Sequence, residues 1–181
     1  MKYSNMDWGT MEAVVNKLGG MEGVKLFLRG ELEVVAKALD FDTCTFKQLV
    51  NYDLSIKELV KEYDWKNDDL TDKNFPSVEK GEKEVEFTLF HFGKSMTSEE
   101  AISKMEKSGY RSATIKELLS FGNKYPDLQR EFPIVALGSV AKLDGGQCVG
   151  SLDESCSERG ADLHSYGIAG GGRSRFLAVH K

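Results

Sequence analysis

The sequence has no long hydrophobic run. Its longest nearly uncharged apolar stretch is 132–141, whereas a membrane-spanning helix needs about twenty such residues. The first nine residues contain no apolar core of the kind that a secretory signal peptide has, and Asp7 already lies among them. We therefore expect no membrane span and no signal peptide, and by default a cytoplasmic location.

An excess of basic charge is also missing. The 181 residues include 24 Lys and Arg against 29 Asp and Glu, which gives a formal net charge of −5. Binding to nucleic acid or to an anionic membrane through charge requires a basic surface. Nucleic acid is therefore not an expected partner. Hydrophobic residues make up 40% of the chain, which is enough for a globular core.

Cysteine is scarce. The three cysteines, Cys44, Cys148 and Cys156, are too few for a scaffold built on disulfides, and we expect reduced thiols. A bridge between Cys148 and Cys156 remains an alternative. Their spacing of eight is wide for paired zinc ligands, and His164 would supply only a third ligand. We predict no metal and no cofactor.

The composition of the chain changes near Pro76, which divides the sequence into two parts. Apolar residues at helical spacing predict helices over 11–18 and 22–39, the second interrupted by Gly30. Shorter capped helices are expected at 45–50 and 55–63, and the highly charged stretch 64–86 is typical of a connection. This gives a helical module at 1–75, a linker at 76–83 and a second domain at 84–181.

The two short helices around the turn at 51–54 also permit a helix-turn-helix interpretation. The second helix would then present Lys57 and Lys61 to DNA. However, Glu58 and Glu62 lie on the same helix in an acidic region, and phosphates would repel them. A regulator with a ligand-sensing C-terminal domain is thus the alternative function.

The second part predicts mixed secondary structure. Alternation over 85–90 indicates a strand, and Thr97 and Thr114 are candidate N-caps of two helices, Thr114 with Glu117 forming a capping box. Apolar runs at 133–138 and 175–180 predict two buried strands. The fold class is therefore α+β.

Residues 144–174 differ from the rest of the chain. Eight of the 18 glycines lie in this segment, lysine is absent from 143 to 180, and neither a period of two nor one of 3.6 is evident. We expect a surface segment held at both ends by strands, either one long loop or glycine-rich turns between short strands. Because long structureless loops are rare in compact domains, the segment is the leading candidate for function.

The pieces 108–119, 132–139 and 175–179 resemble the variable proteins of diversity-generating retroelements, which carry a C-type lectin-like domain. The resemblance covers about 84–181. It implies that adenine-directed mutagenesis diversifies the C-terminal segment, a process whose reachable codons exclude Lys, Met, Trp, Gln and Glu. Between 144 and 174, only Gln147, Glu154 and Glu158 lie outside the reachable set.

This resemblance implies a binding surface whose residues change without disturbing the core. The expected framework comprises Leu118, Leu119, Ile134, Val135, Leu137, Phe176, Leu177 and Val179. Leu152 and Leu163 are expected to be buried anchors. The expected ligand-binding residues are Asp153, Ser155, Ser157, Arg159, Asp162, His164, Ser165, Tyr166 and Ile168.

Other chemistries fit the same segment less well. Gly170–Ser174 lacks the lysine and following helix of a phosphate loop. Cys156 and His164 form a conceivable nucleophile and base, although nothing in their spacing requires it. Some C-type lectins bind sugars through calcium, but their Glu-Pro-Asn triplet is missing here. We predict a non-enzymatic binding protein with a broad surface for a protein ligand; its oligomeric state stays open.

Overall fold

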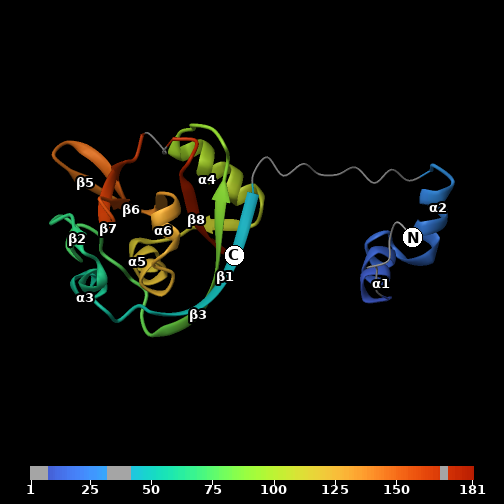
Figure 1. The fold of residues 1–181 in the computed structure, drawn as a ribbon, viewed down its shortest axis with the longest axis horizontal. Coiled ribbons are helices and arrows are strands. Elements are labelled where there is room, and N and C mark those ends of the chain that lie inside the picture. Colours follow the sequence, from blue (N-terminus) through green and yellow to red (C-terminus); the bar gives the residue numbers. More distant parts are fainter. Residues whose placement is uncertain (1–7, 32–41, 168–170) are drawn as a thin grey trace. The chain divides into compact units, whose positions relative to one another are not determined.

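The computed structural model describes residues 8–31, 42–167 and 171–181. The chain divides into two compact units, residues 1–39 and 40–181 (Figure 1). This boundary lies well before Pro76. Residues 42–75, expected in a helical module, and the expected linker 76–83 belong to the larger unit, because the strand that starts at Asp42 pairs with one that starts at Glu82.

The smaller unit contains two short helices, α1 (Trp8–Lys17) and α2 (Gly20–Leu28). Gly19 and Gly20 have φ values of 86° and 82°, a left-handed conformation that suits glycine and separates the helices. The helix expected over 11–18 is confirmed. The helix expected over 22–39 ends at Leu28, just before Gly30 at φ 73°, and 32–39 lie outside the described residues.

One mixed sheet organises the larger unit. Its order is β1-β3-β8-β5-β6-β7-β2, and β4 also pairs with β8. The β5–β8 and β2–β7 pairs are parallel and the others antiparallel. The strands are β1 (Asp42–Asn51), β2 (Trp65–Lys66), β3 (Glu82–His91), β4 (Tyr110–Ser112), β5 (Ile134–Leu143), β6 (Gly146–Ser155), β7 (Glu158–Ser165) and β8 (Arg175–His180). The predicted α+β class is confirmed.

Helices of the larger unit begin where their caps predict. α4 (Ser98–Lys107) starts with a capping box between Thr97 and Glu100, and α5 (Ile115–Lys124) with one between Thr114 and Glu117. The remaining helices are short: α3 (Ile56–Leu59), the 3₁₀ turn Val60–Glu62 and α6 (Leu128–Glu131). Among the described residues, no helix is long and apolar enough to cross a membrane.

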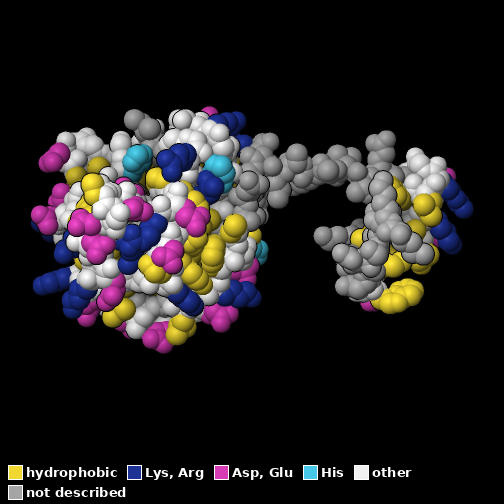
Figure 2. Space-filling model, viewed as in Figure 1, with side chains coloured by type: hydrophobic (Ala, Val, Ile, Leu, Met, Phe, Trp, Pro, Cys, Tyr) yellow, Lys and Arg dark blue, Asp and Glu magenta, His cyan; other side chains and the backbone are white. Residues whose placement is uncertain are grey.

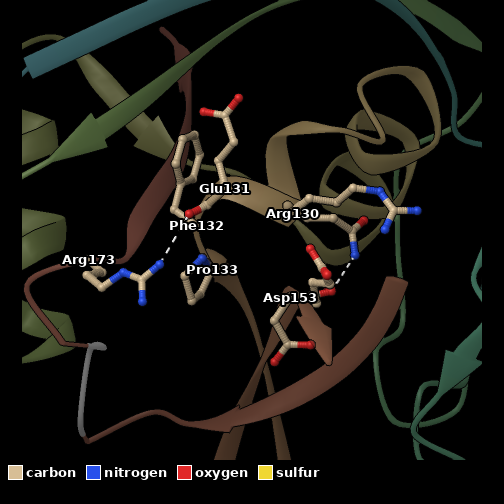
Figure 3. A pocket seen from close by; sticks show the side chains of 8 residues that line it. Arg130, Glu131, Phe132, Pro133, Asp153 and Arg173 are labelled. Carbon is tan, nitrogen blue, oxygen red and sulfur yellow. Dashed lines mark hydrogen bonds between the residues drawn. The ribbon is translucent and has the colours of Figure 1, made fainter. Parts of the chain in front are cut away.

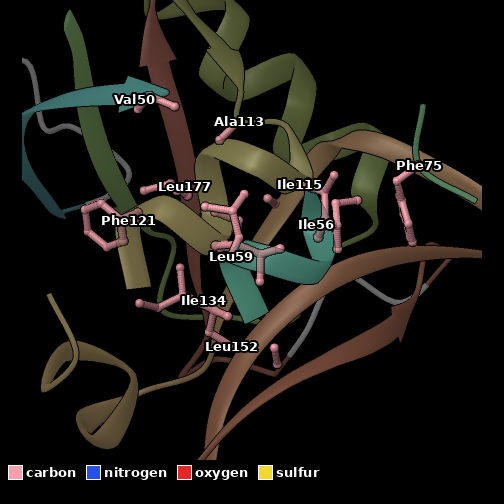
Figure 4. Packing of buried hydrophobic residues seen from close by; sticks show 14 of the residues in the cluster. Val50, Ile56, Leu59, Phe75, Ala113, Ile115, Phe121, Ile134, Leu152 and Leu177 are labelled. Carbon is pink, nitrogen blue, oxygen red and sulfur yellow. The ribbon is translucent and has the colours of Figure 1, made fainter. Parts of the chain in front are cut away.

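Two hydrophobic clusters form the core. The larger contains residues of α3 and α5 together with sheet residues such as Leu152 and Leu177 (Figure 4). The smaller contains Met105 of α4 with Phe90 and Phe176. Alternate residues of β8 thus enter different clusters, as its apolar run predicts for a strand buried on both faces. The expected framework is confirmed, since all eight of its residues are buried.

Residues 45–50 form part of β1 and not the expected helix. Val50 belongs to the larger cluster, and Phe46 packs against it. Gln48 between them donates a hydrogen bond to the Ser120 carbonyl over 2.8 Å. The intervening residues Lys47 and Leu49 are exposed. A period of two therefore governs this stretch. The helix predicted at 55–63 exists as α3 and the 3₁₀ turn, with Ser55 as its cap.

The charged segment 64–86 is not a free connection. Leu70 and Phe75 are buried in the larger cluster, and Trp65–Lys66 adds an edge strand to the sheet beside β7. High charge marked the solvent-facing side chains of this segment, while two apolar residues anchor it.

A buried ionic network joins three parts of the larger unit. Glu117 of α5 accepts hydrogen bonds from Arg111 at 2.7 and 2.9 Å and from the Tyr52 hydroxyl at 2.5 Å. Burial raises the pKa of Glu117, but the hydrogen bonds from Arg111 and Tyr52 outweigh it and hold the pKa below its ordinary value. Glu117, which completes the capping box of α5, therefore also fixes the helix to β4 and to Tyr52 directly after β1.

Candidate functional site

Most of the segment expected to bind a ligand is an antiparallel hairpin. β6 pairs with β7 from Cys148–Ser165 to Ser155–Glu158. Cys156 and Ser157 connect the strands with φ values of 52° and 68°, which is the twist that a two-residue hairpin turn requires. The segment is therefore mainly ordered strand, and the alternative of one long loop is wrong.

The hairpin has a core face that anchors it. Leu152 and Ala161 lie opposite each other and are fully buried, and Leu163 packs against the same cluster. Both leucines are anchors, as predicted. A Cβ atom added at Gly150 would lie 2.2 Å from Cδ1 of Ile115, so α5 packs directly on the backbone of β6.

The opposite side of the two strands forms a polar face, which we define as Ser151, Asp153, Ser155, Asp162 and His164. In the register, Ser151 lies opposite Asp162, and Val149 opposite His164. Asp153, Asp162 and His164 are half-buried, Ser155 is exposed and Ser151 is buried. Alternation along each strand thus gathers these polar residues on one side. Val149 lies on the same side but is buried in the smaller cluster, so the part of the face near the turn is the more accessible one.

Two residues from the preceding segment extend this face. A Cβ at Gly160 would lie 2.1 Å from Cζ2 of Trp65, so the indole covers that glycine. Asn67 donates a hydrogen bond from Nδ2 to Oδ1 of Asp162 over 3.0 Å. Both residues lie in the stretch expected to be a connection, and neither was among the expected ligand-binding residues. The sequence holds one indication of this role: Trp65 is an aromatic residue in a highly charged stretch.

Asp153 is the most perturbed acid of the polar face. Burial and the nearby carboxylate of Asp162 raise its pKa, and His164 opposes them. Its Oδ1 atom is enclosed and has no hydrogen-bond partner within the described part of the chain. A buried acceptor without a partner carries a desolvation cost, which agrees with the raised pKa.

Arg159 does not belong to the polar face, although it was a predicted ligand contact. Its guanidinium lies 4.9 Å from the centre of the Tyr63 ring and donates hydrogen bonds to the carbonyls of Glu62 and Gly122, at 3.1 and 2.8 Å. Alternation directs Arg159 to the core side, where it joins the hairpin to α5 and to the segment before β2. It is a structural residue.

The other predicted contacts lie at the ends of the hairpin. Ser157 is exposed in the turn, and its carbonyl accepts a hydrogen bond from Arg130 over 2.8 Å. Ser165 is exposed at the end of β7. Tyr166 is half-buried against the smaller cluster, and its carbonyl accepts a hydrogen bond from Ser98. Ile168 lies outside the described residues.

A shallow pocket of about 170 Å³ lies beside the turn of the hairpin (Figure 3). Arg130, Phe132, Asp153 and Arg173 are among its lining residues, and the Gln129 side chain donates a hydrogen bond to the Asp153 carbonyl over 2.6 Å. Sites for small molecules usually measure about 300–1,000 Å³. The pocket is thus better suited to receive one side chain of a larger partner than to enclose a small molecule.

The structure keeps Cys156 and His164 apart. Cys156 lies in the turn, shortly before Glu158 at the start of the β7 pairing. His164 lies six residues beyond Glu158 along β7, which is roughly 20 Å for an extended strand. A nucleophile and its base must approach to about 3 Å. All three cysteines are free, so the alternative bridge between Cys148 and Cys156 is absent. The described residues contain no group of three side chains suited to a metal ion.

Comparison with known proteins yields no relative: no family model matches the chain, and no curated protein and no solved structure is detectably similar to it. The function is therefore inferred from the geometry of the hairpin.

Proposed function

We propose that the protein is a non-enzymatic binding protein, similar to the variable proteins of diversity-generating retroelements. In this proposal its larger unit is a C-type lectin-like domain. The polar face of the β6–β7 hairpin, with Trp65 and Asn67, recognises a protein ligand.

The order of elements supports the proposed fold. Within 84–181, the first strand β3 and the last strand β8 pair antiparallel, and α4 and α5 lie between them in the sequence. The meander β5–β6–β7 then precedes β8. This order of strand, helix, helix, strands and buried last strand is the one expected of a C-type lectin-like domain.

The observation that carries the proposal is the division of the hairpin into two faces. Leu152 and Ala161 on the core face have no exposed surface, whereas Ser155 on the polar face is exposed and Asp162 and His164 are half-buried. Replacing an accessible residue typically changes stability by less than about 0.5 kcal/mol. Such a face tolerates the changes that a diversified binding site undergoes.

A protein ligand fits this surface better than a small molecule. The polar face is the side of a sheet, and the adjoining pocket is small. Trp65, His164 and Tyr166 offer ring surface, and Asp153 and Asp162 offer acceptors, which is the mixture of rigid rings and adaptable polar groups found in antibody loops.

The alternative of a helix-turn-helix regulator loses its sequence basis. Its first helix was expected at 45–50, where the chain forms β1. Its second helix has only the four residues of α3 before a 3₁₀ turn. Neither element has the length of a recognition helix that enters the major groove.

Sequencing the gene across its source population tests the proposal. We expect amino-acid replacements to concentrate at 151–166 with a period of two, frequent at Ser155, Asp162 and His164 and rare at Leu152 and Ala161. Arg159 is the internal control, because it lies in the same segment but faces the core. An invariant hairpin, or replacements spread evenly along the chain, would refute a diversified binding face.

A further inference from the structure

Exposed apolar side chains are concentrated in the smaller unit. Of the ten large hydrophobic residues exposed in the described part of the chain, six belong to residues 8–31. They are Trp8, Met11, Val14, Met21, Phe27 and Leu28. Trp8 and Leu28 are 85% and 77% exposed, and Figure 2 shows hydrophobic surface on this unit. Clustered apolar surface of this kind marks an interaction site.

The two helices contact each other but do not bury these side chains. Gly23 is buried, and a Cβ atom there would lie 1.5 Å from the Leu18 carbonyl oxygen, so α2 passes directly over the end of α1. Met11 and Val14 of α1 and Leu18, directly after it, are spaced by three and four residues, as are Met21, Val24 and Leu28 on α2. Each helix therefore has an apolar stripe without a complete cover.

Helices of ten and nine residues need such a cover in order to persist. Isolated helices shorter than about 12–15 residues are marginal in water, and units below about 40 residues usually depend on a disulfide, a metal or association. Residues 1–39 contain no cysteine, and the described residues include no group suited to a metal ion. Association is the remaining source of stability.

The net charge of residues 8–31 favours a second copy of the chain as the partner. Residues 8–31 contain three acids, Glu12, Glu22 and Glu31, and three bases, Lys17, Lys25 and Arg29, so their net charge is zero. An anionic membrane or nucleic acid would favour a basic polar side. Two copies of a neutral helical pair with both charge signs meet without net repulsion, and acids of one copy are available to bases of the other.

Exposed large hydrophobic residues are scarcer in the larger unit. In its described part, the exposed large hydrophobic residues number only four, Leu49, Leu54, Val78 and Val140. We propose that residues 8–31 are a self-association element, in which the α1–α2 pairs of two copies pack stripe to stripe as a four-helix assembly. The inference is independent of the proposed ligand-binding function.

Light scattering of the full chain over a range of concentrations tests this inference. We expect a mass of twice 20.2 kDa for the natural protein, with helix content by circular dichroism that rises with concentration together with the mass. Leu28→Glu, which places a charge on the α2 stripe, should shift the mass to 20.2 kDa. Val78→Glu is the matched control, because Val78 is 94% exposed in the larger unit, and it should leave the mass unchanged.

Three results would overturn the proposal. The first is a natural protein that stays at 20.2 kDa over the whole range. The second is an unchanged dimer in the Leu28→Glu variant. The third is a monomer whose helix content does not depend on concentration, which would indicate that the larger unit of the same chain covers the stripes.

Discussion

Glu117 shows how one side chain joins several segments of the larger unit. It caps α5 through the Thr114 amide at 2.7 Å, binds Arg111 of β4 through two hydrogen bonds and accepts a third from Tyr52, which follows β1. Its side chain has no exposed surface. A buried carboxylate is stable only when its charge is compensated in this way, so the three contacts depend on its ionised form.

The stability of the larger unit should therefore depend on the ionisation of Glu117. Its folded-state pKa lies below the ordinary 4.5, so its stabilising contribution is complete above pH 4.5 and is lost as the pH falls through the folded-state pKa. We expect Glu117→Gln to lower the free energy of unfolding by about 2 kcal/mol at pH 7, the usual scale for losing hydrogen bonds to a charged group. The difference from the natural protein should shrink below pH 4.5.

Denaturant unfolding between pH 7 and pH 3 measures this difference. Glu84→Gln, at an exposed position of β3, is the control and should have little effect at any pH. A Glu117→Gln deficit that stays constant with pH would contradict the assigned role of the carboxylate.

At the scale of elements, the contact between β6 and α5 determines how the hairpin sits on the core. Gly150 allows Ile115 and Leu118 of α5 to approach the strand backbone, and Leu152 two residues later enters the larger cluster. The core face of the hairpin is thus fitted to α5 at the level of single methyl groups.

A methyl group at Gly150 should disturb this contact. Gly150→Ala places Cβ 2.2 Å from Cδ1 of Ile115 and 3.2 Å from Cδ2 of Leu118, and we expect a loss of about 1–3 kcal/mol in the free energy of unfolding. Adding Ile115→Val removes the opposing methyl group and should restore part of the loss. Gly146→Ala is the control in the same strand, because the nearest neighbouring atom lies 3.6 Å from the added Cβ. Equal effects at both glycines would show that the close approach is not the cause.

Local signals explain which elements could be predicted from the sequence. The helices after Thr97 and Thr114 carry their capping residues within four positions, so a short window contains the information. The pattern at 45–50 predicts the wrong element because six residues that mix apolar and polar side chains suit a helical turn as well as a strand, and only the pairing with β3 distinguishes the two.

Long-range contacts explain why part of the candidate site was missed. Asn67 and Asp162 meet although 95 residues separate them, and no local pattern indicates that β2 joins the edge of the sheet. Within the hairpin, small polar residues concealed the alternation. For this reason Arg159 could not be assigned to the core face from its residue type alone.

In the whole molecule, different parts of the chain provide stability and recognition. The larger unit derives its stability from two hydrophobic clusters and the Glu117 network, while the polar face of the hairpin contributes few buried apolar atoms. The smaller unit would join copies of the chain, and each assembly would then present at least two polar faces. Linked binding sites can raise the apparent affinity by about 10²–10⁴ when both engage one target.

A scan of all single substitutions at 146–165 in the full chain, read out as resistance to proteolysis, tests this separation most directly. We predict tolerance at Ser155, Asp162 and His164, and loss of resistance for most replacements of Leu152 and Ala161. Tolerance should alternate along both strands. If replacements on the polar face destabilise the protein as much as those on the core face, the hairpin is not separable from the core, and the central claim fails.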